Sequence, residues 1–447
     1  MLLKLQNNQW QLRWQTTEQT LFTDKDTVLT VAQWFQQIQA ACHVIAQQPG
    51  KTVLLYQPDC QLFSVWFFAL CLQGKHIVLA PDAQPGTLQY AMMHCDWQVP
   101  DMSPTMPEPA TDNVESLLLA GDIRVSFFTS GSTGAPKLIH KTLTLLLTEV
   151  QTLQQQFSTQ LPPNCQFAAT VSHQHIYGLL FRLLWPICND QLIFRSQIRF
   201  LEQWQDLLQQ HPTVLIASPA HLSRFDDVAR LSPYRNNSCA VFSSGGPLPE
   251  IVPPLFINAL GAAPLEVFGS TETGGIAFRQ RHLPDTPWQV FDGIAIGQND
   301  ELALTLTSPN LGHSEHYTTQ DKVLLLDNRH FQLLGRLDRI VKLEEKRLAL
   351  PEMEQHCLSC ELVTAAAAIV LQQERPQLAM AVVLSPAGEQ LLAHSGKLAV
   401  NQQLKQHLLQ RFERVMLPRK FRYVACLPYN PQGKLPQQQL EALFIHD

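Results

Sequence analysis

A run of nine residues, 129–137, concentrates groups that could hold a phosphate. It reads Thr-Ser-Gly-Ser-Thr-Gly-Ala-Pro-Lys and follows a short apolar segment. Gly131 and Gly134 allow the backbone to approach an anion, and successive N–H groups in such a loop form an anion-binding concavity. The added donors are the hydroxyls of Thr129, Ser130, Ser132 and Thr133 and the ammonium of Lys137. A flexible surface turn is the alternative, and a Walker P-loop is disfavoured because no Gly-Lys-Ser/Thr closes the run.

Other segments carry residues that suit nucleotide chemistry. In 267–275, the ring of Phe268 could stack on a purine, and the carboxylate of Glu272 could hold Mg²⁺ through oxygen. The remaining segments are Ser-Ser-Gly-Gly-Pro-Leu at 243–248, Tyr-Thr-Thr-Gln-Asp at 317–321, Gly-Arg-Leu-Asp-Arg-Ile-Val-Lys at 335–342 and Pro-Gln-Gly-Lys at 431–434. Taken alone, each segment is also typical of a turn or a solvated charge.

In their order along the chain, the segments resemble the motifs of the adenylate-forming superfamily of AMP-binding enzymes. That superfamily contains acyl-CoA synthetases, the adenylation domains of nonribosomal peptide synthetases, and luciferases. The resemblance runs from about residue 50 to residue 436. In kind, the chain resembles a short stand-alone acyl or aryl acid ligase. A single motif could match by chance, but five in order could not, so the resemblance implies an enzyme that uses ATP and Mg²⁺.

The resemblance also implies a role for individual residues. Lys434 would bridge the reacting carboxylate and the α-phosphate, Thr271 would contact that phosphate, and Glu272 would hold the magnesium ion. Asp321 would bind both ribose hydroxyls, and Arg336 would contact the ribose. The predicted catalytic residues are Thr129, Thr271, Glu272 and Lys434. The predicted nucleotide-binding residues are Thr129, Ser130, Gly131, Ser132, Thr133, Gly134, Lys137, Gly245, Gly246, Phe268, Gly269, Ser270, Thr271, Asp321 and Arg336.

The acyl pocket and the hinge are further expectations from the resemblance. The pocket candidates are His175, Ser218 and Gly245, and Asp338 would be the pivot between two domains. His173 and His175 could otherwise form a metal site or a polar turn. The chain has Gln320 and Glu345 where the family commonly has glycine. The position of Glu345 borders the family's tunnel for the pantetheine arm. Glu345 therefore concerns the thiol-transfer step.

Alternating strand and helix patterns predict an α/β fold with a parallel sheet. The expected strands are 52–56, 76–80, 166–170, 214–217, 239–243 and 265–268, and the expected helices are 63–73, 143–157 and 177–184. From about residue 300 the alternation is typical of antiparallel strands, at 302–307 and 322–327. The tail adds strands at 365–371, 378–384 and 421–424 and a helix at 402–412. We therefore expect a large N-terminal domain of β-sheets covered by helices, residues 1–336, joined by a hinge to a small α+β domain, residues 337–447.

Composition sets wider limits on function. The chain has 447 residues, of which 45% are hydrophobic and 16% charged, as in packed globular proteins. A net charge of −6 argues against a general nucleic-acid binder. The apolar stretch 63–72 is shorter than the ~20 residues that span a bilayer, so a buried helix is expected. Without an apolar secretion signal we expect a cytoplasmic protein with ten reduced cysteines, Cys357 and Cys360 included.

The expected function is ATP-dependent activation of a carboxylic acid, aromatic or medium-chain, to an acyl-adenylate with release of pyrophosphate. The acyl group would then pass to a phosphopantetheine thiol of coenzyme A or of acyl carrier protein. One alternative is a non-catalytic nucleotide-binding relative, which Lys434, Glu272 and Asp321 disfavour because such a relative would lose these charges. Another is a phosphotransferase, which would release ADP rather than AMP.

Overall fold

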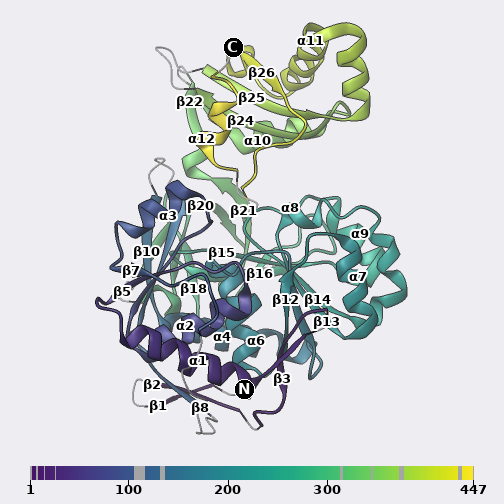
Figure 1. Ribbon diagram of the computed structural model, residues 1–447. Helices are drawn as coiled ribbons and strands as arrows, with labels where there is room; N and C mark the ends of the chain where they lie inside the picture. The colour runs from purple at the N-terminus through teal and green to yellow at the C-terminus, as the bar shows by residue number, and fades with distance from the viewer. Residues whose placement is uncertain are drawn as a thin grey trace.

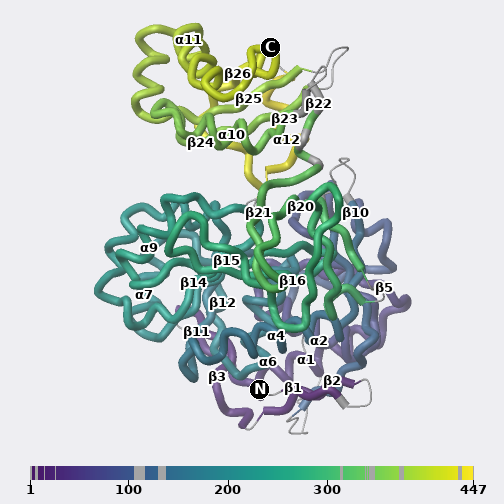
Figure 2. Tube along the Cα trace, turned by 180° about the vertical axis from the view of Figure 1, so that it is seen from behind, coloured from purple at the N-terminus to yellow at the C-terminus, as the bar shows by residue number. Residues whose placement is uncertain are grey.

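The computed structural model describes residues 3–6, 9–14, 16–25, 27–104, 116–130, 136–312, 316–343, 346–371, 377–430 and 435–445. A larger part contains the elements up to β21, and a smaller part contains those from β22 onwards. The smaller part stands on one side of the larger one in both views (Figures 1 and 2). This architecture confirms the expected α/β class with a small C-terminal α+β unit.

One long sheet runs through the larger part, and among the described residues its order is β18-β19-β20-β21-β17-β16-β15-β14-β13-β11-β12-β3-β4. These strands are β3 (Thr20–Thr23), β4 (Val28–Thr30), β11 (Gln166–Ala169), β12 (Leu192–Gln197), β13 (Thr213–Ala217), β14 (Ser238–Ser243), β15 (Leu265–Ser270), β16 (Gly274–Gln280), β17 (Trp288–Val290), β18 (Ala295–Gln298), β19 (Ala303–Thr307), β20 (Tyr317–Leu325) and β21 (His330–Arg336). Strands β11 to β15 pair in parallel, as expected. The antiparallel part expected from about residue 300 starts earlier, at β15–β16, because the tight 271–273 turn reverses the chain there; β3 and β4 at the other edge are also antiparallel.

A second sheet carries the segment that precedes the phosphate loop. Its order is β10-β9-β6-β5-β7, with β5 (Thr52–Leu55), β6 (His76–Leu79), β7 (Trp97–Gln98), β9 (Arg124–Ser130) and β10 (Pro136–Thr142). Only the β9–β10 pair is antiparallel in this part of the described chain. A small third sheet joins β1 (Leu3–Gln6), β2 (Gln9–Arg13) and β8 (Ser116–Ala120).

Helices cover these sheets and enclose an aromatic core. They are α1 (Val31–Ala46), α2 (Cys60–Leu72), α3 (Pro85–Met92), α4 (Leu143–Phe157), α5 (Ile176–Gly178), the π-helical turn η2 (Leu179–Leu184), α6 (Trp185–Cys188), α7 (Leu201–Gln210), α8 (Pro219–Leu222) and α9 (Val252–Leu260). Short 3₁₀ turns follow at η1 (Ser158–Gln160), η3 (Val228–Asn237) and η4 (Pro309–Leu311).

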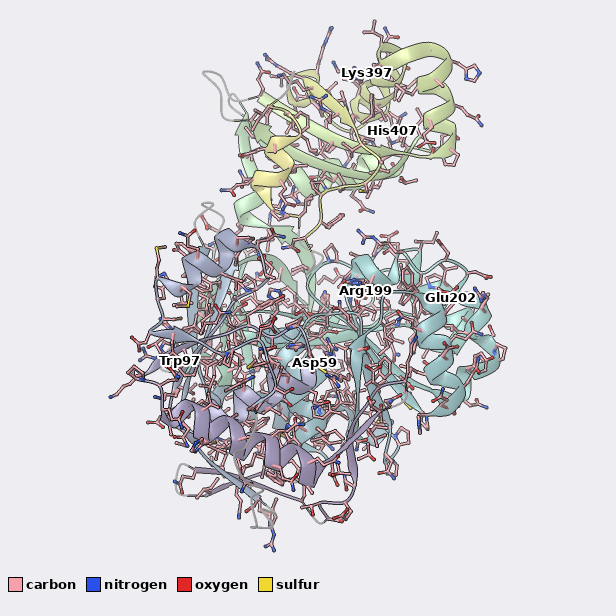
Figure 3. The ribbon with its side chains drawn as sticks, viewed as in Figure 1. Asp59, Trp97, Arg199, Glu202, Lys397 and His407 are labelled. Carbon is pink, nitrogen blue, oxygen red and sulfur yellow. The ribbon has the colours of Figure 1, made fainter. Side chains whose placement is uncertain are left out.

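Helix α2 confirms the buried-helix interpretation of residues 63–72. It begins at Cys60 rather than at residue 63, because the Asp59 carboxylate accepts a hydrogen bond from Leu62 N–H at 2.8 Å and caps the helix. Asp59 also pairs with Arg195 and lies near the middle of the larger part (Figure 3). None of the helices in the described ranges combines the length and apolar character needed to cross a bilayer.

The smaller part has its own sheet and core. Its elements are η5 (Leu337–Arg339), β22 (Ile340–Leu343), β23 (Lys346–Ala349), α10 (Leu350–Leu358), β24 (Val363–Leu371), β25 (Gln377–Leu384), α11 (Pro386–Leu409), η6 (Arg414–Met416), β26 (Lys420–Tyr423) and α12 (Gln437–Ala442). The helix expected at 402–412 is longer and starts at Pro386, after the Ser385 cap. Gly396, with φ +75°, is not helical and divides the helix. Because this break interrupts the helical period, the sequence pattern predicts only the second half.

Candidate active site

The described residues of the predicted phosphate loop, Thr129, Ser130 and Lys137, belong to two paired strands. Strands β9 and β10 pair antiparallel, with Thr129 opposite Lys137 and Ser130 opposite Pro136. The predicted positions Gly131, Ser132, Thr133 and Gly134 lie outside the described residues. The strand expected just before the loop is β9, which pairs in parallel with β6 and so anchors the hairpin in the second sheet.

Glu272 lies at the tip of another hairpin, between β15 and β16. Two hydrogen bonds lock this turn: Ser270 N–H donates to Thr273 Oγ1 at 3.0 Å, and Thr273 N–H donates to Ser270 Oγ at 3.2 Å. A side chain at Gly269 would place its Cβ 2.2 Å from the Gly274 carbonyl oxygen, so the hairpin can close only with glycine there. The turn therefore presents the half-buried Glu272 from a fixed backbone.

Three predicted residues meet around one tyrosine. Asp321 on β20 and Arg336 on β21 are partners in the strand register, and Arg336 Nη1 lies 3.4 Å from Asp321 Oδ1. Burial raises the pKa of Tyr317, the Glu272 and Asp321 carboxylates raise it further, and the Arg336 guanidinium opposes them. Residues from the β15–β16 and β20–β21 hairpins thus share one electrostatic environment.

The glycine turn predicted beside the adenine follows β14. Ser244 Oγ donates to the carbonyl oxygen of Val267 on β15 at 2.9 Å, and Gly245 has a φ of +96° that favours glycine. The Phe268 ring is half-buried, with its centroid 5.4 Å from that of Trp288. These segments leave the carboxyl ends of neighbouring parallel strands, the usual ligand-binding edge of such a sheet.

Comparison with known proteins agrees with this geometry. The family model described as "AMP-binding enzyme" matches residues 97–301. Residues 97–301 therefore match the AMP-binding enzyme family.

The chain is similar to two kinds of curated ligase. A 4-coumarate–CoA ligase of Cereibacter sphaeroides is 27% identical over 229 residues, which cover 50% of this chain and about half, 51%, of that protein. A D-alanine–D-alanyl carrier protein ligase of Bacillus mycoides is 22% identical, with 95% of this chain and 96% of that protein covered. The ATP-bound crystal structure of MatB from Rhodopseudomonas palustris has the same fold, with a TM-score of 0.80, 16% identity and 97% of both chains covered.

Two buried charged residues outside the recognised motifs contact the Glu272 turn. Lys141 on β10 is 4% exposed, and burial lowers its pKa against the opposing effect of the Glu149 and Glu272 carboxylates. Glu149 on α4 is 5% exposed, and burial raises its pKa against the Gly275 N–H and the Lys141 ammonium. The sequence carries a signal for Glu149, since it stands on the apolar face of α4 with Leu146 and Leu153.

The segment of the predicted acyl pocket is attached to the end of β5. His173 Nε2 lies 2.8 Å from the Gln57 carbonyl oxygen, and Gln174 Nε2 donates to the same oxygen at 2.6 Å. His175 follows as the residue before α5. Ser218 is 1% exposed and caps α8, with its Oγ 2.8 Å from His221 Nδ1. The Ser218 hydroxyl therefore already has partners within α8, and its predicted contact with the substrate stays a prediction.

The predicted pivot lies in the short turn η5, after β21. Asp338 is described only in its backbone, and Lys434 and Glu345 lie outside the described residues. The next residue, Arg339, contacts Glu354 on α10 through two hydrogen bonds, of 3.0 and 2.7 Å. Arg339 therefore belongs to the smaller part, immediately after the predicted pivot.

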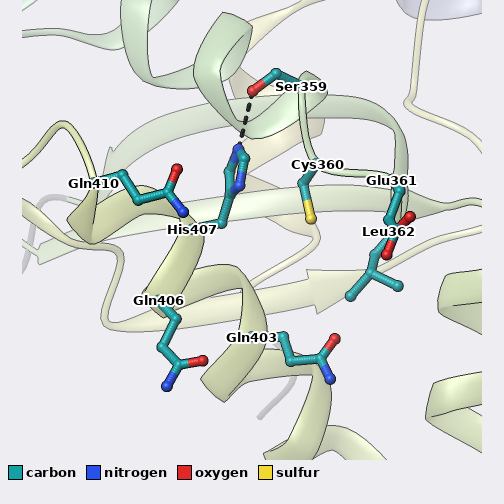
Figure 4. A pocket seen from close by; sticks show the side chains of 8 residues that line it. All are labelled: Ser359, Cys360, Glu361, Leu362, Gln403, Gln406, His407 and Gln410. Carbon is teal, nitrogen blue, oxygen red and sulfur yellow. Dashed lines mark hydrogen bonds between the residues drawn. The ribbon is translucent and has the colours of Figure 1, made fainter.

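A pocket in the smaller part has no connection with these residues. It lies between the end of α10 and α11 (Figure 4), with Ser359 Oγ 2.9 Å from His407 Nε2. Cys360 lines it, whereas Cys357 is in the core, where burial raises the pKa of its thiol to about 12. The Cys357–Cys360 pair therefore fits the expected structural role.

Proposed function

We propose that this protein uses ATP to activate a carboxylic acid and then passes the acyl group to a thiol. A carboxylate oxygen attacks the α-phosphorus, the bond to the bridging oxygen of the β-phosphate breaks, and pyrophosphate leaves with the electron pair. A phosphopantetheine thiolate then attacks the carbonyl carbon of the acyl-adenylate, and AMP leaves. The observation that carries this proposal is the pairing of Asp321 with Arg336 across β20–β21, 3.4 Å apart, together with the hydrogen-bonded turn that presents Glu272.

The main barrier to the first step is charge crowding, because an anion attacks a polyanion. Positioned cations and N–H donors lower such a barrier, typically by about 3–4 kcal/mol for a single donor. In this proposal Lys434 offsets charge at the reacting oxygens, and Thr271 contacts the α-phosphate. The 129–137 loop, including Thr129 and Lys137, orients the β- and γ-phosphates and releases them as pyrophosphate.

Glu272 fits a magnesium ion in its chemistry. It is a carboxylate on a locked hairpin tip, half-buried, and Mg²⁺ prefers oxygen ligands of this kind together with phosphates. When bound, the ion would neutralise charge on the phosphates. The carboxylate of Glu272 would hold it, and the Ser270–Thr273 hydrogen bonds would keep that carboxylate in place.

The nucleoside would be held by residues at the strand ends. Asp321 is 15% exposed in its side chain, and its backbone N–H donates to Thr319 Oγ1 at 3.0 Å, which fixes the carboxylate that would accept both ribose hydroxyls. Arg336 would contact the ribose from the next strand. Phe268 and the turn of Gly245 and Gly246 would border the adenine.

We propose an aromatic or medium-chain acid as the substrate, with His175 and Gly245 facing the acyl group. The similar proteins named above include a CoA ligase and a carrier protein ligase, so both thiol acceptors are retained. We also retain the expectation of a cytoplasmic location. The domain boundary is part of the proposal: residues 337–447 would rotate about Asp338 after adenylation, remove Lys434, and admit the thiol.

The deciding experiment incubates the purified protein with MgATP and a panel of carboxylic acids. We expect pyrophosphate and AMP with at least one acid, thioester only when coenzyme A or acyl carrier protein is added, and no acid-dependent pyrophosphate exchange in Lys434→Ala. Release of ADP would support a phosphotransferase instead. Absence of exchange across the panel would support a non-catalytic nucleotide-binding relative.

A further inference from the structure

A buried lysine holds the backbone of the Glu272 turn. The Lys141 ammonium donates to the carbonyl oxygen of Glu272 at 2.7 Å and to the carbonyl oxygen of Asn310 at 2.7 Å. It also interacts electrostatically with the Glu272 carboxylate. Asn310 belongs to η4, which precedes Tyr317 and strand β20. One side chain therefore joins β10 to the Glu272 turn and to η4.

A buried glutamate holds the same turn from the other side. Glu149 Oε1 accepts the Gly275 N–H at 2.7 Å. A Cβ at Gly274 would lie 2.6 Å from Glu149 Oε2, and Gly274 has a φ of +69°. The two glycines after Glu272 thus let a carboxylate pack directly against the backbone. The lysine and the glutamate together fix the turn at its second and fifth residues, counted from Thr271.

Both residues come from the elements that follow the phosphate loop. Lys141 is near the end of β10, and Glu149 is in the second turn of α4, which the Thr142 side chain caps. Burying two charges is costly unless they compensate each other, and the surrounding core could have accommodated apolar side chains instead. Such a pair is best explained by what it positions, here the turn of Glu272 relative to the 129–137 hairpin.

We propose that Lys141 and Glu149 are positioning residues that fix the Glu272 turn against the phosphate hairpin, so that its carboxylate meets the metal–nucleotide without rearrangement. The proposal rests on the proposed function in so far as Glu272 holds the metal ion. The attachment itself does not depend on that function, so it can be measured separately.

The first measurement needs no activity. Hydrogen exchange of a peptide that covers residues 270–276 is compared in the wild type, Lys141→Met and Glu149→Ala. We expect amide hydrogen exchange in this segment to be roughly 10-fold faster or more in Lys141→Met. The two hydrogen bonds that Lys141 donates to carbonyl oxygens would no longer oppose local opening of the turn. Unchanged exchange in both variants would overturn the proposal, whatever the enzyme turns out to catalyse.

The second measurement follows acid-dependent pyrophosphate exchange against the Mg²⁺ concentration. We expect the half-maximal Mg²⁺ concentration to rise roughly 10–100-fold in Lys141→Met, the range for loss of a group that supports a metal ligand. The KM for the acid should change much less. An unchanged Mg²⁺ requirement would overturn the proposal, whereas a wild type that fails with every acid would refute the proposed function and leave the hydrogen-exchange result standing.

A matched control lies at the other end of the same hairpin. Arg281 and Glu266 form an ion pair with 2.5 Å between Nε and Oε1 and with side chains 7% and 4% exposed. Arg281→Met should lower the unfolding temperature without changing the Mg²⁺ requirement. If Arg281→Met changed the Mg²⁺ requirement as much as Lys141→Met does, the loss of any buried charge would have this effect. That result would contradict a specific role for Lys141. If Lys141→Met does not fold, Glu149→Ala, which removes the acceptor for the Gly275 N–H, provides the same comparison.

Discussion

Asp321 and Arg336 face each other across the β20–β21 strand pair, with 3.4 Å between Oδ1 and Nη1. Arg336 is the last residue of β21, directly before the turn that contains Asp338. The residue predicted to bind the ribose is therefore in contact with the residue that precedes the predicted pivot. A nucleotide held by Asp321 would be coupled to the start of the smaller part.

Asp321→Asn should weaken ATP binding more than it weakens the fold. The substitution keeps the shape but removes the charge that would accept two ribose hydroxyls. Hydrogen bonds to charged groups are worth about 1.5–3 kcal/mol, so we expect the KM for ATP to rise roughly 10–100-fold. Pyrophosphate exchange at varied ATP concentration measures this change.

The control for Asp321 is Asp327→Asn, in the turn of the same hairpin. Asp327 Oδ1 accepts the N–H groups of Arg329 and His330 at 2.7 Å each, away from the strand ends that carry the site. It should cost some stability and leave the KM for ATP unchanged. If both substitutions raised the KM for ATP equally, Asp321 would be a structural residue of the hairpin and not a ribose ligand.

Asp338→Pro should separate the two half-reactions. Proline fixes φ and removes a backbone N–H, so it restricts rotation at the predicted pivot. We expect pyrophosphate exchange close to that of the wild type and a strong loss of thioester formation. Asp338→Ala, which retains backbone freedom, distinguishes restricted rotation from loss of the carboxylate. Parallel loss of both half-reactions in Asp338→Pro would argue against a hinge at this position.

Glu354→Gln should destabilise the smaller part. The Glu354 carboxylate accepts two hydrogen bonds from Arg339 and one from Ala368 N–H, at 2.6 Å. We expect a loss of about 1–3 kcal/mol and faster hydrogen exchange in β24. Glu352→Gln on the same helix is the control, because its pair with Arg411 is exposed and should contribute less than about 1 kcal/mol. Equal losses would show that burial of the Arg339 pair has no energetic consequence.

His173 should make the protein sensitive to acid. Burial, together with the nearby Arg182 charge, lowers its pKa from 6.5 to about 3. Below about pH 6.5 the unfolded chain therefore binds a proton that the folded chain refuses, so stability falls as the pH falls from 6.5 towards 3. The slope from this residue is at most about 1.4 kcal/mol per pH unit. In His173→Gln, urea midpoints measured between pH 7 and pH 4 should fall less steeply; an equally steep fall would contradict the prediction.

Much of the fold could be predicted because local patterns agree with it. Helix α4 has the predicted bounds, since Thr142 caps it and its apolar face is regular. Helix α11 was only partly predicted, because Gly396 interrupts its period. The expectation for Ser218 shows another limit. A serine before a helix can cap it, face a ligand or do both; the contact with His221 shows the cap, and the pocket role of Ser218 stays a prediction.

The sequence by itself predicted the chemistry of the site: its residue types indicated a phosphate loop, and the resemblance to a known family implied which groups would meet a ribose or a metal ion. It also determined that the 129–137 loop follows a strand. Only the tertiary structure decided how the segments meet. Lys141 and Glu149 are 131 and 126 residues from their partners in the Glu272 turn, and no local pattern encodes contacts across such separations. Sheet pairing and helix packing bring them together, which is why a buried charge pair beside the proposed metal ligand became visible only in three dimensions.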